Sequence, residues 1–128
     1  MALCNTFIRS CQGSGSDSDF SRYMVNPSGE KARILSGHIT PNVSVSTHAS
    51  NYMTWNVKKG STTIATFTTN SSGGAALTAG TPVALTFTGT GKDMEIDSGS
   101  AVLVEGVNSG TGPAYDVEVT LVLQGIRQ

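Results

Sequence analysis

The stretch 51–89 constrains the fold more than any other part of the chain, because its apolar and polar residues alternate with a period of two. Met53, Trp55 and Val57 alternate with polar neighbours over 51–58. In an extended chain, residues two apart project to the same side, so this pattern predicts a half-buried strand. β-branched and aromatic residues, which strands favour, are frequent throughout the stretch.

Two further strands are predicted from the same stretch. Gly60 supplies a hairpin turn, since glycine accepts the positive φ that a tight turn requires. Residues 62–68 then return as the second strand. Residues 82–88 form a third strand that opens on a proline, and its inward-facing residues are predicted to be Val83, Leu85 and Phe87.

The rest of the chain continues as short strands at regular spacing. Strands are predicted at 32–40, 42–47, 92–97, 101–107 and 114–126. The last has the clearest alternation, with one face made of Tyr115, Val117, Val119, Leu121 and Leu123. Eight or so such strands without helices predict an all-β fold, an antiparallel β-sandwich of jelly-roll-like form.

The residues before position 30 differ from this pattern. Residues 3–9 are compatible with a strand, whereas the Gly-Ser-Asp-rich tract 10–19 is typical of a linker. We therefore expect a flexible N-terminal arm over 1–29 and a sandwich domain over 30–128. The alternative is that these residues add another strand to the same sandwich.

The overall composition excludes several classes of function. Only 13% of the 128 residues are charged and the net charge is -1, so no basic surface for nucleic acid is expected. There is no apolar run long enough to span a membrane, and the first residues do not have the pattern of a secretory signal. We expect a single compact domain, synthesised and assembled in a cytoplasm.

The search for catalytic or metal-binding residues favours a protein that is not an enzyme and has no cofactor. Asp93, Glu95 and Asp97 share one face of the strand predicted at 92–97, as a cation site or half of a carboxylate pair would require. A solvated outer face is the favoured interpretation, because charged residues normally take the exposed side of a strand. His38 and His48 have no matching nucleophile or ligand cluster, and no nucleophile-elbow motif is present.

Two cysteines and two aromatic residues have competing interpretations. Cys4 and Cys11 are interpreted as ordinary thiols, since a reducing cytoplasm disfavours the short disulfide loop they could close. Trp55 is predicted to lie in the core because it shares the apolar face of its strand. Tyr52 falls on the opposite face, where an exposed ring could stack on a sugar.

The run 52–88 resembles short β-sandwich proteins encoded among the virion genes of tailed bacteriophages. Those proteins have a Y-x-x-W-x-V-like strand, a glycine turn, an S-T-x-I-A-like return strand and an L-T-A-G-T-P connector. The matching positions here are Tyr52, Trp55, Val57, Gly60, Ile64, Ala65, Leu77, Thr78, Ala79, Gly80, Thr81 and Pro82. The family consists of capsid decoration (cement) and head-fibre proteins, and the likeness extends loosely over about the last hundred residues.

The resemblance implies a non-enzymatic virion protein on the capsid exterior that binds the major capsid protein and stabilises the head. It also implies a homotrimer, without nucleic acid or membrane as a partner. We expect the arm to order on contact with a capsid neighbour, and its apolar residues are the predicted contacts: Leu3, Phe7, Ile8, Phe20, Tyr23 and Met24. The alternative function is a receptor- or glycan-binding module of a phage tail or fibre that uses Tyr52 and the loops.

Overall fold

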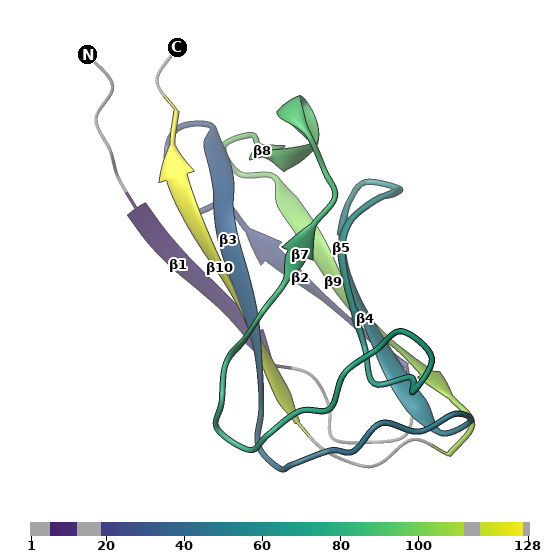
Figure 1. The fold of residues 1–128 in the computed structure, drawn as a ribbon. Helices are drawn as coiled ribbons and strands as arrows, with labels where there is room; N and C mark the ends of the chain where they lie inside the picture. The colour runs from purple at the N-terminus through teal and green to yellow at the C-terminus, as the bar shows by residue number, and fades with distance from the viewer. Residues whose placement is uncertain (1–5, 13–18, 112–115, 127–128) are drawn as a thin grey trace.

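The computed structural model describes residues 6–12, 19–111 and 116–126. Within these ranges the chain forms ten strands and one short 3₁₀ helix (Figure 1). The elements are β1 (Thr6–Gln12), β2 (Phe20–Val25), β3 (Ala32–Pro41), β4 (Tyr52–Lys59), β5 (Thr62–Thr68), β6 (Val83–Ala84), β7 (Thr86–Phe87), η1 (Gly91–Met94), β8 (Glu95–Ile96), β9 (Ala101–Ser109) and β10 (Val117–Gly125).

The strands form two sheets that pack face to face, which confirms the predicted all-β sandwich. Sheet A has the order β1-β10-β3-β6, with β8 also paired to β3, and sheet B has the order β2-β9-β4-β5-β7. All pairings between named strands are antiparallel. Several of them are nested along the chain: β1 with β10, β2 with β9, β3 with β6 and β8, and β4 with β5. Consecutive strands β1, β2, β3 and β4 therefore alternate between the sheets.

The core lies between the sheets and follows the predicted alternation. In β10, Val117, Val119, Leu121 and Leu123 are buried. In β4, Met53, Trp55 and Val57 are buried, so the core position predicted for Trp55 is confirmed. Tyr115, predicted to continue the β10 face, lies outside the described residues. The buried apolar residues from both sheets form a single cluster, whose burial is the main stabilising contribution to such a domain.

The β4–β5 hairpin forms as predicted, with one irregularity. Gly60 has φ of 60° in the turn, as the sequence required. The register shifts between Val57 and Lys58, which leaves an extra residue in β5, so that both Ile64 and Ala65 are buried. This is the geometry of a β-bulge, and it increases the local twist of the sheet.

The strand predicted at 82–88 is divided between the two sheets. β6 pairs with β3 in sheet A, and β7 pairs with β5 in sheet B. Leu85 lies between them, and its backbone N–H donates to Gly37 O at 2.9 Å. Gly37 permits this approach, because a Cβ there would lie 2.9 Å from Leu121 Cδ2 and 3.0 Å from Phe87 Cζ.

Two predicted strands are wrong in detail. Residues 42–47 form a loop in which Val45 alone makes an isolated bridge, to Leu77, and Val43 is 43% exposed. Residues 92–97 contribute to η1 and to the two-residue strand β8, so only part of that segment is extended. In both cases the alternating stretch was too short to form a full strand between glycine-rich and polar neighbours.

The residues before position 30 belong to both sheets. β1 is the terminal strand of sheet A and pairs with β10, while β2 is the terminal strand of sheet B and pairs with β9. Of the two alternatives that the sequence left open for this segment, the described residues have the strand arrangement. Before the expected boundary at 29/30, the described strands β1 and β2 are paired with β10 and β9.

A buried asparagine joins the end of β2 to the rest of the domain. Asn26 is fully buried, and its amide donates to Glu30 O at 2.9 Å and to Ile96 O at 3.0 Å. Its Oδ1 accepts the backbone N–H of Ser28 at 3.1 Å and the Ser28 hydroxyl at 2.9 Å. Because buried polar groups are costly without partners, this satisfied network fixes the β2–β3 connection against β8.

Candidate partner-binding surface

Five of the six predicted contact residues lie in the first two strands. Phe7 and Ile8 lie within β1, and Phe20 is the first residue of β2. Leu3 lies outside the described residues. The backbone of the predicted arm is therefore held in register with β10 over 6–12 and with β9 over 20–25.

Tyr23 and Met24 lie on opposite faces of β2. Tyr23 is 72% exposed, the largest exposure among the exposed large apolar residues, whereas Met24 is 3% exposed and belongs to the core. A partner can touch Tyr23 on the folded domain. It can reach Met24 only if β2 leaves sheet B.

An exposed apolar surface surrounds Tyr23 on the outer face of sheet B. Val25 lies two residues along the strand and is 43% exposed. The neighbouring strand β9 places Leu103 opposite Tyr23 and Ala101 opposite Val25, and both are half-buried. These four residues are called the Tyr23 surface below. Clusters of exposed apolar side chains on a soluble domain commonly mark interaction sites.

The backbone beside this surface is also available for pairing. β1 and β2 each pair with one neighbour, so each has one edge without a ladder among the described residues (Figure 1). The unpaired N–H and C=O groups of an edge strand can accept a strand from another chain. The Tyr23 surface therefore lies beside the free edge of β2, the terminal strand of its own sheet.

The centre of the same sheet face is polar and internally satisfied. Lys58 Nζ lies 2.8 Å from Glu105 Oε1, and Asn56 Nδ2 donates to the same oxygen at 3.2 Å. The Thr66 hydroxyl donates to Asn56 Oδ1 at 2.9 Å. Hydrogen bonding from Lys58 lowers the pKa of Glu105 below its ordinary value, with partial burial acting in the opposite direction. This network spans β9, β4 and β5 and bounds the Tyr23 surface on one side.

Two of the three acidic residues predicted to share a strand face, Glu95 and Asp97, make ion pairs with basic neighbours. Glu95 pairs with Arg33 at 3.3 Å and with Lys31 at 3.8 Å, and Asp97 pairs with Lys31 at 3.6 Å. Asp93 lies apart from them in η1. Within the described residues, no group of three His, Cys, Asp or Glu side chains could hold a metal ion.

The histidines and the tyrosine predicted to be exposed have ordinary surroundings. His48 Nδ1 accepts the backbone N–H groups of Ser50 and Asn51, at 3.0 and 2.9 Å, and so orders the loop before β4. His38 is half-buried within β3. Tyr52 is also half-buried, which leaves only part of its ring for a ligand.

One of the two cysteines lies in the described part of the chain. Cys11 lies in β1 opposite Val119, and Cys4 lies outside the described residues.

Sequence reasoning did not separate the exposed face of β2 from its buried face. The signal was the alternation over 20–25, where Tyr23 and Val25 flank Met24. Six residues with an arginine and a serine among them gave too little contrast to separate an inner from an outer face.

Comparisons by sequence identify no relative. No protein-family model matches the chain, and no curated protein matches it. Among the described residues, no helix is long and apolar enough to cross a membrane.

Comparison by structure gives a match over nearly the whole chain. The fold is similar to that of a chain in the structure titled "Cyanophage Pam1 capsid asymmetric unit", with a TM-score of 0.56 and 16% sequence identity. The match covers 96% of this chain and 86% of that one, so the two chains are of similar length. At this identity the comparison establishes a common sandwich fold.

Proposed function

We propose that this chain is a non-enzymatic structural protein of a bacteriophage virion. It binds the outer capsid surface and stabilises the head, as a decoration (cement) protein does. The end-to-end similarity to a chain of a phage capsid asymmetric unit carries the proposal, because it covers the whole sandwich and not one motif. The resemblance of 52–88 to virion β-sandwich proteins supports it independently. The nested strand pairing supports a jelly-roll form of the sandwich.

The proposed partner is the major capsid protein, and the proposed assembly is a homotrimer on the capsid exterior, formed in the host cytoplasm. The contact we favour combines the Tyr23 surface with the edges of β1 and β2. Aromatic side chains carry a large share of the energy at protein interfaces, and edge strands add backbone hydrogen bonds. Tyr23 is one of the contact residues predicted from the sequence, and its side chain is exposed.

The test is co-sedimentation of the purified chain with capsids that lack it. We expect saturable binding at a fixed ratio to the major capsid protein. Removing residues 1–28 is a poor variant for this purpose, because it deletes β1, β2 and the core residue Met24. Point variants of exposed residues separate binding from folding.

Absence of binding to any capsid preparation would contradict the decoration proposal. Binding to purified tails or to host cells in its place would support the alternative, a receptor- or glycan-binding module of a tail or fibre.

A further inference from the structure

The hydrogen-bond pattern between β2 and β9 determines which backbone groups of β2 are free. Asn26 N–H donates to Ser100 O at 2.8 Å, one residue pair beyond the end of β2. Successive residues of an antiparallel strand direct their N–H and C=O groups to opposite sides, and the register along β2 has no shift. The even-numbered residues of β2 therefore face β9. The free edge carries the N–H and C=O groups of Ser21, Tyr23 and Val25.

A second bond agrees with this assignment. Asn108 N–H in β9 donates to Asp19 Oδ1 at 2.7 Å, so the even-numbered residues of β9 point toward β2. Among the described residues, one group reaches the free edge: Arg22 Nη1 donates to Ser21 O at 2.9 Å. The edge therefore offers three donors and three acceptors in pairs about 7 Å apart. A partner strand of about five residues can form up to about six backbone hydrogen bonds with them.

The residues that present these backbone groups also present the exposed apolar side chains. Tyr23 is 72% exposed and Val25 is 43% exposed, both on the outer face of sheet B. In an antiparallel pair, the side chains of directly opposite residues lie on the same face, about 5 Å apart. A strand that pairs with β2 would therefore cover Tyr23 and Val25 with its own side chains. Backbone hydrogen bonding and apolar burial would come from a single contact.

Arg22 indicates which kind of strand fits. It is exposed and makes no ion pair among the described residues. A carboxylate on the strand residue opposite Arg22 would supply charge-assisted hydrogen bonds. The terminal strands β1, β2, β6 and β7 of this chain contain no Asp or Glu, and Glu95 of β8 is already paired with Lys31 and Arg33. A second copy would leave Arg22 without a countercharge, so a different chain is the better occupant.

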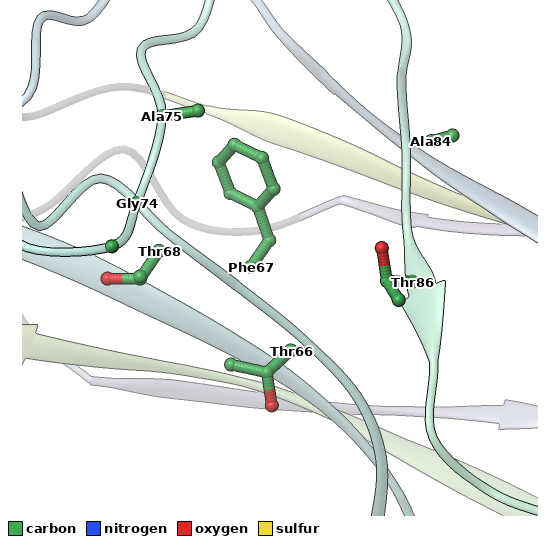
Figure 2. A pocket seen from close by; sticks show the side chains of 8 residues that line it. Thr66, Phe67, Thr68, Gly74, Ala75, Ala84 and Thr86 are labelled. Atoms are coloured by element: carbon green, nitrogen blue, oxygen red, sulfur yellow. The ribbon is translucent and has the colours of Figure 1, made fainter.

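The opposite end of sheet B offers no comparable edge, because β7 and a loop cover β5. Thr66 pairs with Thr86 of β7. Further along β5, Thr68 O accepts the Ala75 N–H at 3.1 Å. A cleft of about 350 Å³ lies between β7 and this loop, and Figure 2 shows the Phe67 side chain between the two. Strand pairing from outside is therefore expected at β2 and not at β5.

We infer that the capsid protein binds this chain by strand addition. An extended segment of the capsid protein pairs with β2 and becomes the outermost strand of sheet B. The pairing is antiparallel, which is the more stable arrangement per residue. The segment carries apolar side chains opposite Tyr23 and Val25, and an Asp or Glu opposite Arg22. This inference rests on the proposed function, and it specifies the element of the capsid protein that the free edge of β2 binds.

Amide hydrogen exchange on the full chain, free and bound to capsids, tests the backbone contact. In the free chain, the N–H groups of Arg22 and Met24 face β9 and should exchange slowly, whereas those of Ser21, Tyr23 and Val25 should exchange fast. After exchange in the bound state, the chain is released under quench conditions and each amide is read by NMR. We expect capsid binding to slow the exchange of the three edge amides by about a hundredfold or more.

Two variants with matched controls test the same contact by co-sedimentation. Ser21→Pro removes an edge-facing N–H and leaves the bonds to β9 in place, and edge strands tolerate proline in that orientation. Ser46→Pro makes the same change in the exposed loop after β3. Arg22→Glu reverses the charge on the edge, and Lys92→Glu reverses it at another exposed position. Ser21→Pro and Arg22→Glu should each weaken capsid binding by about tenfold or more, and the controls should leave it unchanged. Thermal unfolding checks that all four variants fold.

The possible results separate this inference from the proposed function. If the chain binds capsids while the amides of Ser21, Tyr23 and Val25 still exchange fast, strand addition is wrong and the decoration proposal stands. Slow, concentration-dependent exchange of these amides in the free chain would assign the edge to a second copy and overturn the inference. Equal binding by Arg22→Glu and Lys92→Glu would overturn the carboxylate opposite Arg22. If the unmodified chain binds no capsid, the proposed function fails and the inference fails with it.

Discussion

On the N-terminal side of the sandwich, β1 and β2 end their sheets with strands of seven and six residues. On the opposite side the sheets end in β6, β7 and β8, each of two residues. Short edge strands leave little backbone for another chain to pair with, and natural sheets use them to avoid association. The N-terminal side has no such protection in its described residues, which is why we assign the partner contact to it.

The two sides also differ in what connects them to the core. Segment 82–88 passes from sheet A to sheet B and leaves a cleft beside Phe67. β2 stays in sheet B for its full length, and the buried Asn26 follows it directly. The side with short edge strands therefore has an opening toward the core, whereas the side with long edge strands has a continuous outer face. Four changes test this contrast, in order of decreasing effect.

The largest effect is expected from Asn26→Ala. The change leaves the carbonyl groups of Glu30 and Ile96 without their donor in a buried place, and it also removes the acceptor for Ser28. We expect a loss of about 3 kcal/mol in the free energy of unfolding. Urea unfolding measures it, with Asn42→Ala as the control. Asn42 is exposed and accepts a single bond from Asp116 N–H, so that change should cost under about 1 kcal/mol. Equal losses would show that Asn26 does not lock β2 to the domain.

The second effect concerns capsid binding. Tyr23→Ser should reduce the affinity for capsids by about 2 kcal/mol, which is about 30-fold. Val25→Ser should reduce it less. Val43→Ser is the matched control, because Val43 has the same 43% exposure as Val25 but lies in the loop after β3. Co-sedimentation gives the affinities. A loss with Val43→Ser and none with Tyr23→Ser would place the contact on the loops.

The third change tests the crossing segment. Gly37→Ala would put a Cβ within 3.2 Å of Leu121, Phe87 and Leu85. We expect this overpacking to lower the free energy of unfolding by about 2 kcal/mol and to weaken the packing of the crossing segment on sheet A. Thermal and urea unfolding measure the loss. Gly29→Ala is the control, since nothing lies within 4 Å of a Cβ there. If Gly37→Ala left the free energy of unfolding unchanged, the crossing segment would be able to shift and accommodate the added methyl group without cost.

The smallest effect is a pH dependence at Glu105. Its pKa is lowered in the folded state from the ordinary value of 4.5, so it stabilises the fold above that pH. This contribution is lost as the pH falls through the lowered pKa. Glu105→Gln should cost under about 1 kcal/mol at pH 7, and the cost should be smaller at about pH 3, below the ordinary pKa of the group. Urea unfolding at both pH values checks it, with exposed Glu118→Gln as the control. A cost that persists at acid pH would point to packing in place of charge.

Strand-forming segments and their faces were largely predictable because their signals are local. The alternation in 51–58 and 114–126 predicted the buried faces of β4 and β10, and Gly60 predicted the hairpin turn. The weaker alternation in 42–47 and 92–97 led to wrong strand predictions. A few apolar residues among glycines and charged residues can be buried without forming a full strand.

The candidate binding site was harder to predict from the sequence than the strands were. The sequence identified Tyr23 as a contact residue, but it gave Met24 beside it the same role. Which of the two faces water depends on β2 pairing with β9, some eighty residues further along the chain. The cleft beside Phe67 had no sequence signal, because 82–88 alternates like an ordinary single strand.

The sequence by itself determined that this chain is a β-sandwich with a core built from alternating residues, since a period of two is a property of neighbouring residues and of backbone geometry. The tertiary structure decided that β1 and β2 close the two sheets, that Leu85 marks a change of sheet, and where the exposed aromatic and the open cleft lie. Those features depend on which distant strands pair, and pairing is decided by burial summed over both sheets at once.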